Sequence, residues 1–482
     1  MSSPIRIEEW DDTDLRIPPS VPDGIRVRLR QALFQFAYSV GRWYPFITEF
    51  TFPTELVSVS VDEAKAIVIE GRRLRDLPCS IASSMTPDQV ASALGNLSRR
   101  ISAAITRLGG SSGVFIKLNS RSAKDVVFEE FHETLWNAMQ AELHHTDLSQ
   151  YMPSHSCPVP KLRELEETLA GLFIRQAQAS MRVSDPGAAI DQLLRSGRIY
   201  MDLSKCLECV DHGLPFEAEI AVRAWDPTLL PSMEMRCYVR NKHLTAIAQY
   251  YDSAPLAWLT RGGPAAVTAI REALQERIRH FVEDEVAPKL PHKSFVVDVI
   301  CRHPPEWEQT PLGTEEILPP ARVQERVSTI RGEGPCPMRM GVVEINPFHK
   351  GAASLFAWRG PDRDILLHGF EMRLINPSPR MLTPQLWATP LAHLPAAFAT
   401  RLQEWVTAQC MERCPDQFYR IVRAHRCHWA QARPQEAMPY LAPGWREPRH
   451  RSGTWWVVVG GAALVGLVSL GMVAASRVRR LL

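Results

Sequence analysis

The feature that most constrains this chain is an apolar run without a single charge near its C-terminal end, Trp455–Ala475. A run of this length can cross the hydrocarbon core of a bilayer, about 30 Å thick, as one helix. A buried helix of a globular domain would normally carry a polar face instead. Two tryptophans open the run, as in an interfacial aromatic belt. Arginines flank it on both sides: Arg446, Arg449 and Arg451 before it, and Arg477, Arg479 and Arg480 after it.

The run therefore predicts one C-terminal transmembrane helix over residues 455–475, followed by a basic tail over 476–482. Because so few residues follow it, it leaves the ribosome only at termination. We expect insertion after synthesis, with the N-terminal bulk in the cytosol. The predicted location is the cytosolic face of an intracellular membrane, held by a single-pass C-terminal anchor.

The chain as a whole has the composition of a folded protein, with 45% hydrophobic residues and a formal net charge of +2. Its length allows two to four domains. A nearly balanced charge provides no broad basic field of the kind that carries sequence-independent nucleic-acid binding, so we expect no nucleic-acid partner.

Hydrophobic spacing predicts a sequence of elements typical of an α+β fold. Three- and four-residue steps indicate helices over 86–108, 160–182 and 264–286. Apolar or alternating runs indicate strands over 114–118, 216–225, 233–239, 243–251, 294–301 and 340–345, with a hairpin turn at 240–242.

These elements suggest a division of the chain. The predicted parts are an N-terminal segment over 1–30, a main domain over 31–400, a helical extension over 401–431 and a Pro/Arg-rich linker over 432–454. Residues 302–338 lie inside the main domain. They are rich in proline and glycine without a sustained period, which indicates a long inserted loop.

Two carboxylates stand inside strands that are otherwise apolar. Asp298 lies in the run 295–300, and Glu344 lies two residues before Asn346. A buried carboxylate is costly unless it is paired or binds a metal. Residues i and i+2 of a strand share a face, so these side chains offer oxygen ligands of the kind that Mg²⁺ prefers together with substrate phosphates.

Cations that could bind such phosphates lie in other predicted strands: Lys117, Arg223 and Arg236. The structural alternative is that Asp298 and Glu344 form salt bridges with Arg223 and Arg236. The residues alone favour neither interpretation. The sequence contains no GxxxxGK[ST] loop, and no GxGxxG after a strand, so a nucleotide here would use neither a P-loop nor a Rossmann turn.

Several segments together resemble the cell division cycle protein 123 family, an ATP-grasp-like family of eukaryotes. The resemblance covers roughly residues 30–375, and its most specific parts are KLN, ExRCxV and xNPF. The matching segments are 43–46, 108–110, 115–119, 124–125, 198–203, 222–225, 234–239, 244–249, 295–298, 344–348 and 354–358.

The resemblance implies an ATP-grasp-like fold with antiparallel sheets and packed helices. It implies that Lys117 and Arg223 contact ATP phosphates, and that Asp298, Glu344 and Asn346 hold magnesium. It also implies a chaperone function, in which the gamma subunit of eukaryotic translation initiation factor two is joined to its partner subunits. An ATP-grasp ligase or kinase with an unknown acceptor, and a scaffold that binds no nucleotide, are the alternatives.

The chain departs from the family pattern at several positions. Ser120 and Ala224 replace a tryptophan and a lysine, and Glu344 replaces an aspartate. Tyr250 and Tyr251 replace an arginine and an aspartate, and Ala353 replaces another aspartate. Glutamate still serves as a metal ligand, but the lost lysine and aspartate put ATP affinity or the partner surface in question.

An aromatic cluster near the N-terminus is the candidate partner surface: Trp43, Tyr44, Pro45 and Phe46. Large aromatic side chains are common energetic anchors of interfaces, and the family resemblance suggests that this region receives the partner subunit. The alternative is that these side chains pack under the first β layer and close the core.

Overall fold

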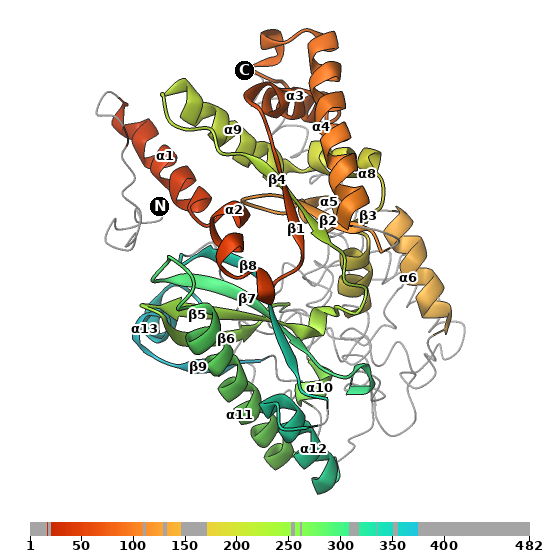
Figure 1. Ribbon diagram of the computed structural model, residues 1–482, viewed down its shortest axis with the longest axis vertical. Helices are drawn as coiled ribbons and strands as arrows, with labels where there is room; N and C mark the ends of the chain where they lie inside the picture. The colour runs from red at the N-terminus through yellow and green to blue at the C-terminus, as the bar shows by residue number, and fades with distance from the viewer. Residues whose placement is uncertain are drawn as a thin grey trace, which may run out of the picture. The chain divides into compact units, whose positions relative to one another are not determined.

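The computed structural model describes residues 17, 21–108, 112–128, 133–145, 171–251, 256–260, 263–307, 318–334, 336–349 and 355–374. These residues fall in one compact unit of the chain. They form an α+β structure with two sheets and helices packed around them (Figure 1). The predicted extension, linker and transmembrane helix, over 401–475, lie outside the described residues, as does Ala353.

The first sheet has four strands in the order β1-β4-β2-β3, and all neighbours are antiparallel. Its strands are β1 (Thr54–Ser58), β2 (Val114–Leu118), β3 (Arg182–Val183) and β4 (Glu219–Ala224). The accompanying helices are α1 (Asp23–Phe36), α2 (Val40–Trp43), α3 (Val61–Arg73), α4 (Pro87–Leu108), α5 (Asp125–Phe128), α6 (Glu133–His145), α8 (Pro186–Arg195) and α9 (Gly197–Asp211). Of these, α4 packs against β1, β4 and α3, and α3 packs against α9.

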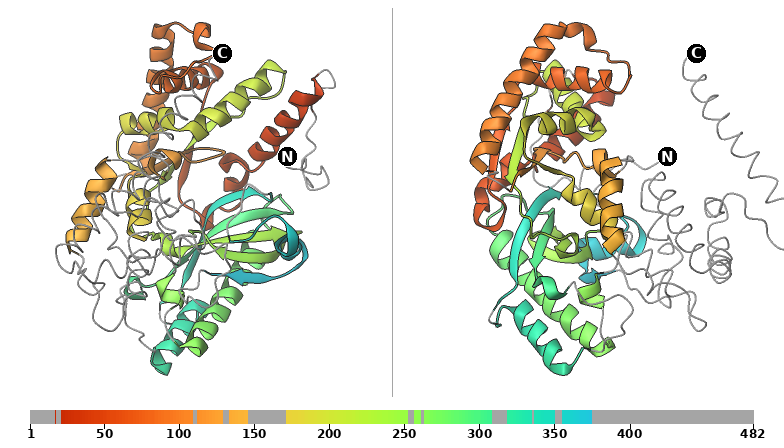
Figure 2. Two further views of the ribbon diagram at one scale, coloured as in Figure 1. Left: turned by 180° about the vertical axis from the view of Figure 1, so that it is seen from behind. Right: turned by 90° about the vertical axis from the view of Figure 1, so that its right-hand side faces the viewer.

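The second sheet has five strands in the order β8-β7-β5-β6-β9, antiparallel except for the β6–β9 pair. Its strands are β5 (Glu234–Arg240), β6 (His243–Gln249), β7 (Phe295–Arg302), β8 (Arg339–Pro347) and β9 (Glu371–Arg373). The accompanying helices are α10 (Ala257–Thr260), α11 (Pro264–His280), the π-helical turn η7 (Phe281–Val286), α12 (Pro320–Arg331) and α13 (Gly360–His368). Apolar clusters on both faces bury this sheet, with α11 and α12 packed together beside it (Figure 2).

Most of the predicted elements are confirmed. The helix predicted over 86–108 is α4, and the strand over 114–118 is β2. The predicted hairpin is β5–β6, and its turn residues Asn241 and Lys242 both have positive φ, 50° and 71°. Two consecutive left-handed residues match the twist of antiparallel strands, which explains why so short a turn suffices.

Two predictions about boundaries are wrong. The segment 302–338 is not a continuous loop, because α12 occupies Pro320–Arg331. Pro320 at the first helical turn and Gly332 in the left-handed conformation, φ 84°, mark its ends. The helix also has a buried face, which includes Val327 and Ile330, against α11. At the N-terminus, α1 crosses the predicted boundary at residue 31, because Leu29 is already fully buried.

The aromatic segment divides between core and surface. Trp43 is fully buried, and Tyr44 is partly buried with its hydroxyl accepting a hydrogen bond from the Thr54 amide at 3.0 Å. Pro45 and Phe46 are exposed, Phe46 to 47%. Trp43 therefore closes the core and is not part of a surface, whereas Pro45 and Phe46 remain candidates for one.

We expect truncation to alanine to have a large effect on stability at Trp43 and almost none at Phe46. Trp43→Ala should lower the free energy of unfolding by about 3–5 kcal/mol, because it empties a site in a packed core. Phe46→Ala should change the free energy of unfolding by less than about 0.5 kcal/mol, because its ring is exposed. Urea denaturation followed by circular dichroism measures both, and equal losses would contradict this division.

Candidate functional site

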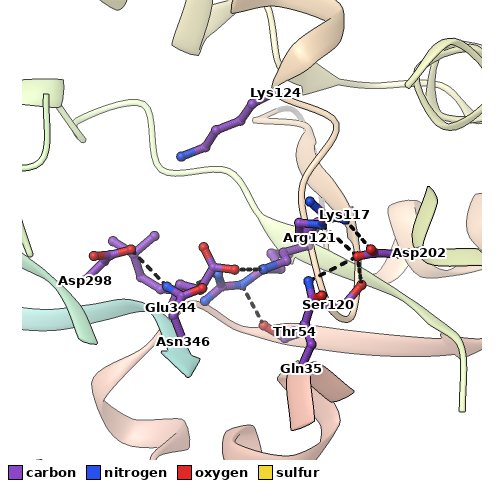
Figure 3. Close-up of polar contacts among 12 residues, drawn as sticks. Gln35, Thr54, Lys117, Ser120, Arg121, Lys124, Asp202, Asp298, Glu344 and Asn346 are labelled. Atoms are coloured by element: carbon purple, nitrogen blue, oxygen red, sulfur yellow. Dashed lines mark hydrogen bonds and ion pairs between the residues drawn. The ribbon is translucent and has the colours of Figure 1, made fainter. Parts of the chain in front are cut away.

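The six residues predicted to form a site come together where the two sheets meet. Figure 3 labels four of them: Lys117, Asp298, Glu344 and Asn346. The first sheet supplies Lys117 from β2 and Arg223 from β4. The second sheet supplies the remaining four: Arg236 from β5, Asp298 from β7, and Glu344 and Asn346 from β8. The structure thus places these side chains in one cluster, while their roles remain predictions.

Asp298 forms the centre of this cluster on the second sheet. It is fully buried, and both of its carboxylate oxygens accept hydrogen bonds from Arg236, each at 2.8 Å. The Asn346 amide also donates to Asp298, at 3.3 Å. These contacts follow from the sheet register, because Asp298 faces Arg236 on β5 and Glu344 on β8. The structural salt bridge is therefore present for this carboxylate.

Glu344 pairs across the two sheets with Lys117, not with an arginine. The Lys117 side chain is 2% exposed and the Glu344 side chain 18%. Burial alone would raise the pKa of Glu344, but Lys117 and Lys124 outweigh it and lower the pKa to about 2. Glu344 is therefore ionised throughout the physiological range.

Arg223 is buried, with 3% exposure, and no carboxylate pairs with it in the described part of the chain. Its guanidinium donates to the Thr51 hydroxyl at 2.7 Å, the Thr54 hydroxyl at 3.2 Å and the Val343 carbonyl at 2.6 Å. Burial lowers its pKa to about 10, against the attraction of Glu344. Arg223 thus remains charged at neutral pH without a counter-ion of its own.

The cluster contains three further residues to which the sequence analysis assigns no role in the site: Lys124, Tyr250 and Glu234. Lys124 donates to the Tyr250 hydroxyl and lies 4.5 Å from the centre of the Tyr250 ring. The Arg236 guanidinium lies 4.7 Å from the same ring. Glu234, on β5, is 5% exposed, and burial raises its pKa to about 7. Lys124 and Glu234 fall in the segments that carry the family resemblance, and that was the signal available to find them.

The loop that carries Lys124 is held by two buried carboxylates. Asp202, on α9, accepts hydrogen bonds from Ser120 at 2.7 Å and from Arg121 Nε at 2.8 Å (Figure 3). At the other end of the loop, Asp125 accepts from the Ser196 hydroxyl at 2.6 Å and from the Arg198 amide at 3.0 Å. Fixing both ends of the loop in this way limits the positions that Lys124 can take.

The charges of the cluster suit an anionic ligand. Its four cations are Lys117, Lys124, Arg223 and Arg236. Against them stand Asp298, Glu344 and the incompletely ionised Glu234. Among the described residues there is no group of three His, Cys, Asp or Glu side chains that could hold a metal ion, so the predicted magnesium ligands depend on Asn346 as the third member.

The fold and site thus define an α+β protein with a buried, cation-rich cluster between two largely antiparallel sheets. The D123 family model matches residues 171–385. Cell division cycle protein 123 of Candida glabrata is 26% identical over 184 residues, which cover 35% of this chain and 38% of that protein. These two sequence matches support a relationship to the Cdc123 family. The chain aligns with less than half of the length of the Candida glabrata protein.

Solved structures of Cdc123 from Schizosaccharomyces pombe are also similar. The structure of Cdc123 covers 71% of this chain and 96% of its own, with 17% identity and a TM-score of 0.39. The C-terminally truncated form covers 72% of this chain and 97% of its own, with 17% identity and a TM-score of 0.40.

The raised pKa of Glu234 makes stability depend on pH. In the chain without added nucleotide or metal, the unfolded state loses this proton near pH 4.5 and the folded state near pH 7. Stability should therefore fall as pH rises between these values, by about 1–3 kcal/mol. Glu234→Gln should remove most of this fall, because it mimics the protonated form.

Urea denaturation at several pH values, with the wild type and Glu234→Gln side by side, measures this effect. The neighbouring Glu344 affects the free energy of unfolding in the opposite direction, because its pKa is lowered. Its stabilising contribution is present above about pH 4.5 and is lost as pH falls toward about 2. A parallel pH dependence of wild type and Glu234→Gln between pH 4.5 and 7 would contradict the assignment.

Proposed function

We propose that the cluster between the sheets binds ATP together with Mg²⁺. The observation that carries this proposal is Arg223, a buried guanidinium without a carboxylate partner among the described residues. An unpaired buried charge is costly, and a phosphate group would compensate it. Lys117, Lys124 and Arg236 are the other cations available to the phosphates.

Asp298, Glu344 and Asn346 would hold the magnesium ion. The two carboxylates are direct cross-strand partners of β7 and β8 and share a face with Asn346. Their oxygens are hard ligands of the type that Mg²⁺ takes. When bound, the ion would neutralise part of the phosphate charge. Arg236 and Lys117, which now pair with these carboxylates, would then be available to the phosphates.

The biological role we propose is that of an ATP-binding, membrane-tethered assembly factor. The D123 match over 171–385 supports the relationship to Cdc123, and the family's role implies the gamma subunit of translation initiation factor two as partner. The exposed Pro45 and Phe46 are the part of the predicted partner surface that burial leaves available. ATP would be bound in support of assembly, with no acceptor required.

Asp298→Asn tests the nucleotide site. The change keeps the shape of the side chain but removes the charge that a magnesium ion needs. We expect the affinity for ATP with magnesium to fall about 10- to 100-fold, whereas binding in the presence of a chelator should not fall, because Arg236 loses the charge of its carboxylate partner. Isothermal titration calorimetry of the full-length chain with ATP, with and without magnesium, measures the difference.

Glu63→Gln is the matched control, because Glu63 is also a buried carboxylate paired with an arginine, Arg100, but lies on α3. Equal ATP affinities of Asp298→Asn and wild type would rule out the site. Phe46→Ala, in contrast, should weaken capture of the gamma subunit and leave the ATP affinity unchanged. ADP formation during the assay would instead favour the ligase or kinase alternative.

The membrane tether is proposed from the sequence alone. Among the described residues no helix is long and apolar enough to cross a membrane, and the run 455–475 lies outside them. Deleting residues 455–482 should move the protein from the membrane pellet to the supernatant, since no other stretch of the sequence is comparably long and apolar. Alkaline carbonate extraction of the full-length chain checks this, and its release into the supernatant would contradict a spanning helix.

A further inference from the structure

A polar cavity of about 420 Å³ lies at the end of β7 and β8, beyond the Asp298–Glu344 pair. Arg302 on β7 is four residues past Asp298, which corresponds to about 13 Å along a strand. The volume is that of a small-molecule site. The residues that line the cavity are Glu49, Phe50, Thr51, Phe52, Asp226, Thr228, Ile300, Arg302, Arg339, Met340 and Val342.

Two arginines face each other directly in this cavity. Arg302 and Arg339 are cross-strand partners of the antiparallel β7–β8 pair, and both line the same space. Like charges directly opposite each other on a sheet are destabilising. A negative charge between them would relieve this repulsion.

Among the described residues, a carboxylate provides that charge for Arg302 alone. Arg302 donates to Asp226 at 2.8 Å. Arg339 is exposed, and the described part of the chain contains no hydrogen bond or ion pair to it. Asp226 is itself committed, since it also accepts from the Thr228 amide at 2.9 Å and the Thr228 hydroxyl at 2.6 Å. The Arg339 guanidinium thus has no carboxylate partner among the residues that the structure describes.

The absence of a side chain at Gly341 leaves room for the Arg302 guanidinium. A Cβ atom at Gly341 would lie 3.1 Å from Arg302 Nη1 and 3.2 Å from the Phe50 carbonyl oxygen. Both distances are shorter than ordinary contacts, so glycine leaves the space that the guanidinium occupies. Arg302 therefore has room beside Gly341, where it pairs with Asp226 and lies across the strand pair from Arg339.

We propose that Arg302 and Arg339 form a binding site for the phosphate or carboxylate group of a small anionic molecule. Arginine presents a planar set of donors that matches such oxyanions. An oxyanion between the two guanidiniums would satisfy Arg339 and relieve the repulsion across β7–β8. Phe50, Phe52 and Met340 provide apolar wall for the remainder of the ligand.

This anion site adjoins the cluster proposed to bind ATP but is separate from it. The Phe52 ring lies between the two, with Arg223 Cζ at 5.0 Å and Arg302 Cζ at 5.8 Å from its centre. Thr51 lines the cavity and also accepts the hydrogen bond from Arg223. The anion site does not require that ATP bind, so the two proposals can be tested separately.

Calorimetric titration of the full-length chain with inorganic phosphate and, in a second arm, citrate tests the proposal and distinguishes the two oxyanions. We expect saturable binding of at least one probe at low ionic strength, also when ATP and magnesium are present. Arg339→Gln should weaken this binding about tenfold or more. Arg359→Gln, at an exposed arginine outside the cavity, should leave it unchanged.

A second variant tests the like-charge pair directly. Arg339→Glu should abolish binding of the probe and raise the thermal midpoint of the chain without ligand, because it places a carboxylate opposite Arg302. The proposal would be overturned if neither probe bound the wild type, if Arg339→Gln bound as the wild type does, or if Arg339→Glu lowered the midpoint. Phosphate binding that ATP displaces and Arg339→Gln does not affect would assign the anion to the nucleotide cluster instead.

Discussion

The ion pair between Lys117 and Glu344 is the interaction on which the site depends, because it joins one sheet to the other inside the protein. Removing two charges from water is costly, and their mutual attraction compensates only when the geometry is good and the remaining donors are satisfied. Arg223 strengthens the same junction through the Val343 carbonyl and the Thr51 hydroxyl. The polar contacts between the sheets are thus made by the residues that would bind a nucleotide.

This arrangement has an energetic consequence for the protein without a ligand. Asp298 is well compensated by Arg236, but Arg223 has no carboxylate partner in the described part of the chain, and Glu234 is buried so far that its pKa rises to about 7. Groups whose pKa values are shifted strongly in different directions gather at functional sites more often than elsewhere. An anionic ligand would add stability where the protein alone has an excess of positive charge.

Sequence reasoning succeeded where the signal was local and failed where burial decided the outcome. The helix α4 and the hairpin β5–β6 follow from spacing and turn residues within one segment. The helix α12 is not predicted, because its apolar positions are few and prolines stand before and after it, and its burial against α11 reveals it. For Trp43 the sequence allows either a surface anchor or a core residue, and its packing decides for the core.

The amino-acid pattern alone is enough to predict which side chains of the site share a face. The two-residue period of a strand places Glu344 and Asn346 together, and an apolar run makes Asp298 a buried carboxylate. The partners of these side chains follow from the packing of distant segments. Lys117 and Glu344 are 227 residues apart in the chain, and Lys124 meets Tyr250 across 126 residues. Such contacts arise from the packing of one sheet against the other, which no local pattern of residues specifies. The same packing decided that Glu344 pairs with a lysine and that Arg223 has no carboxylate partner among the described residues.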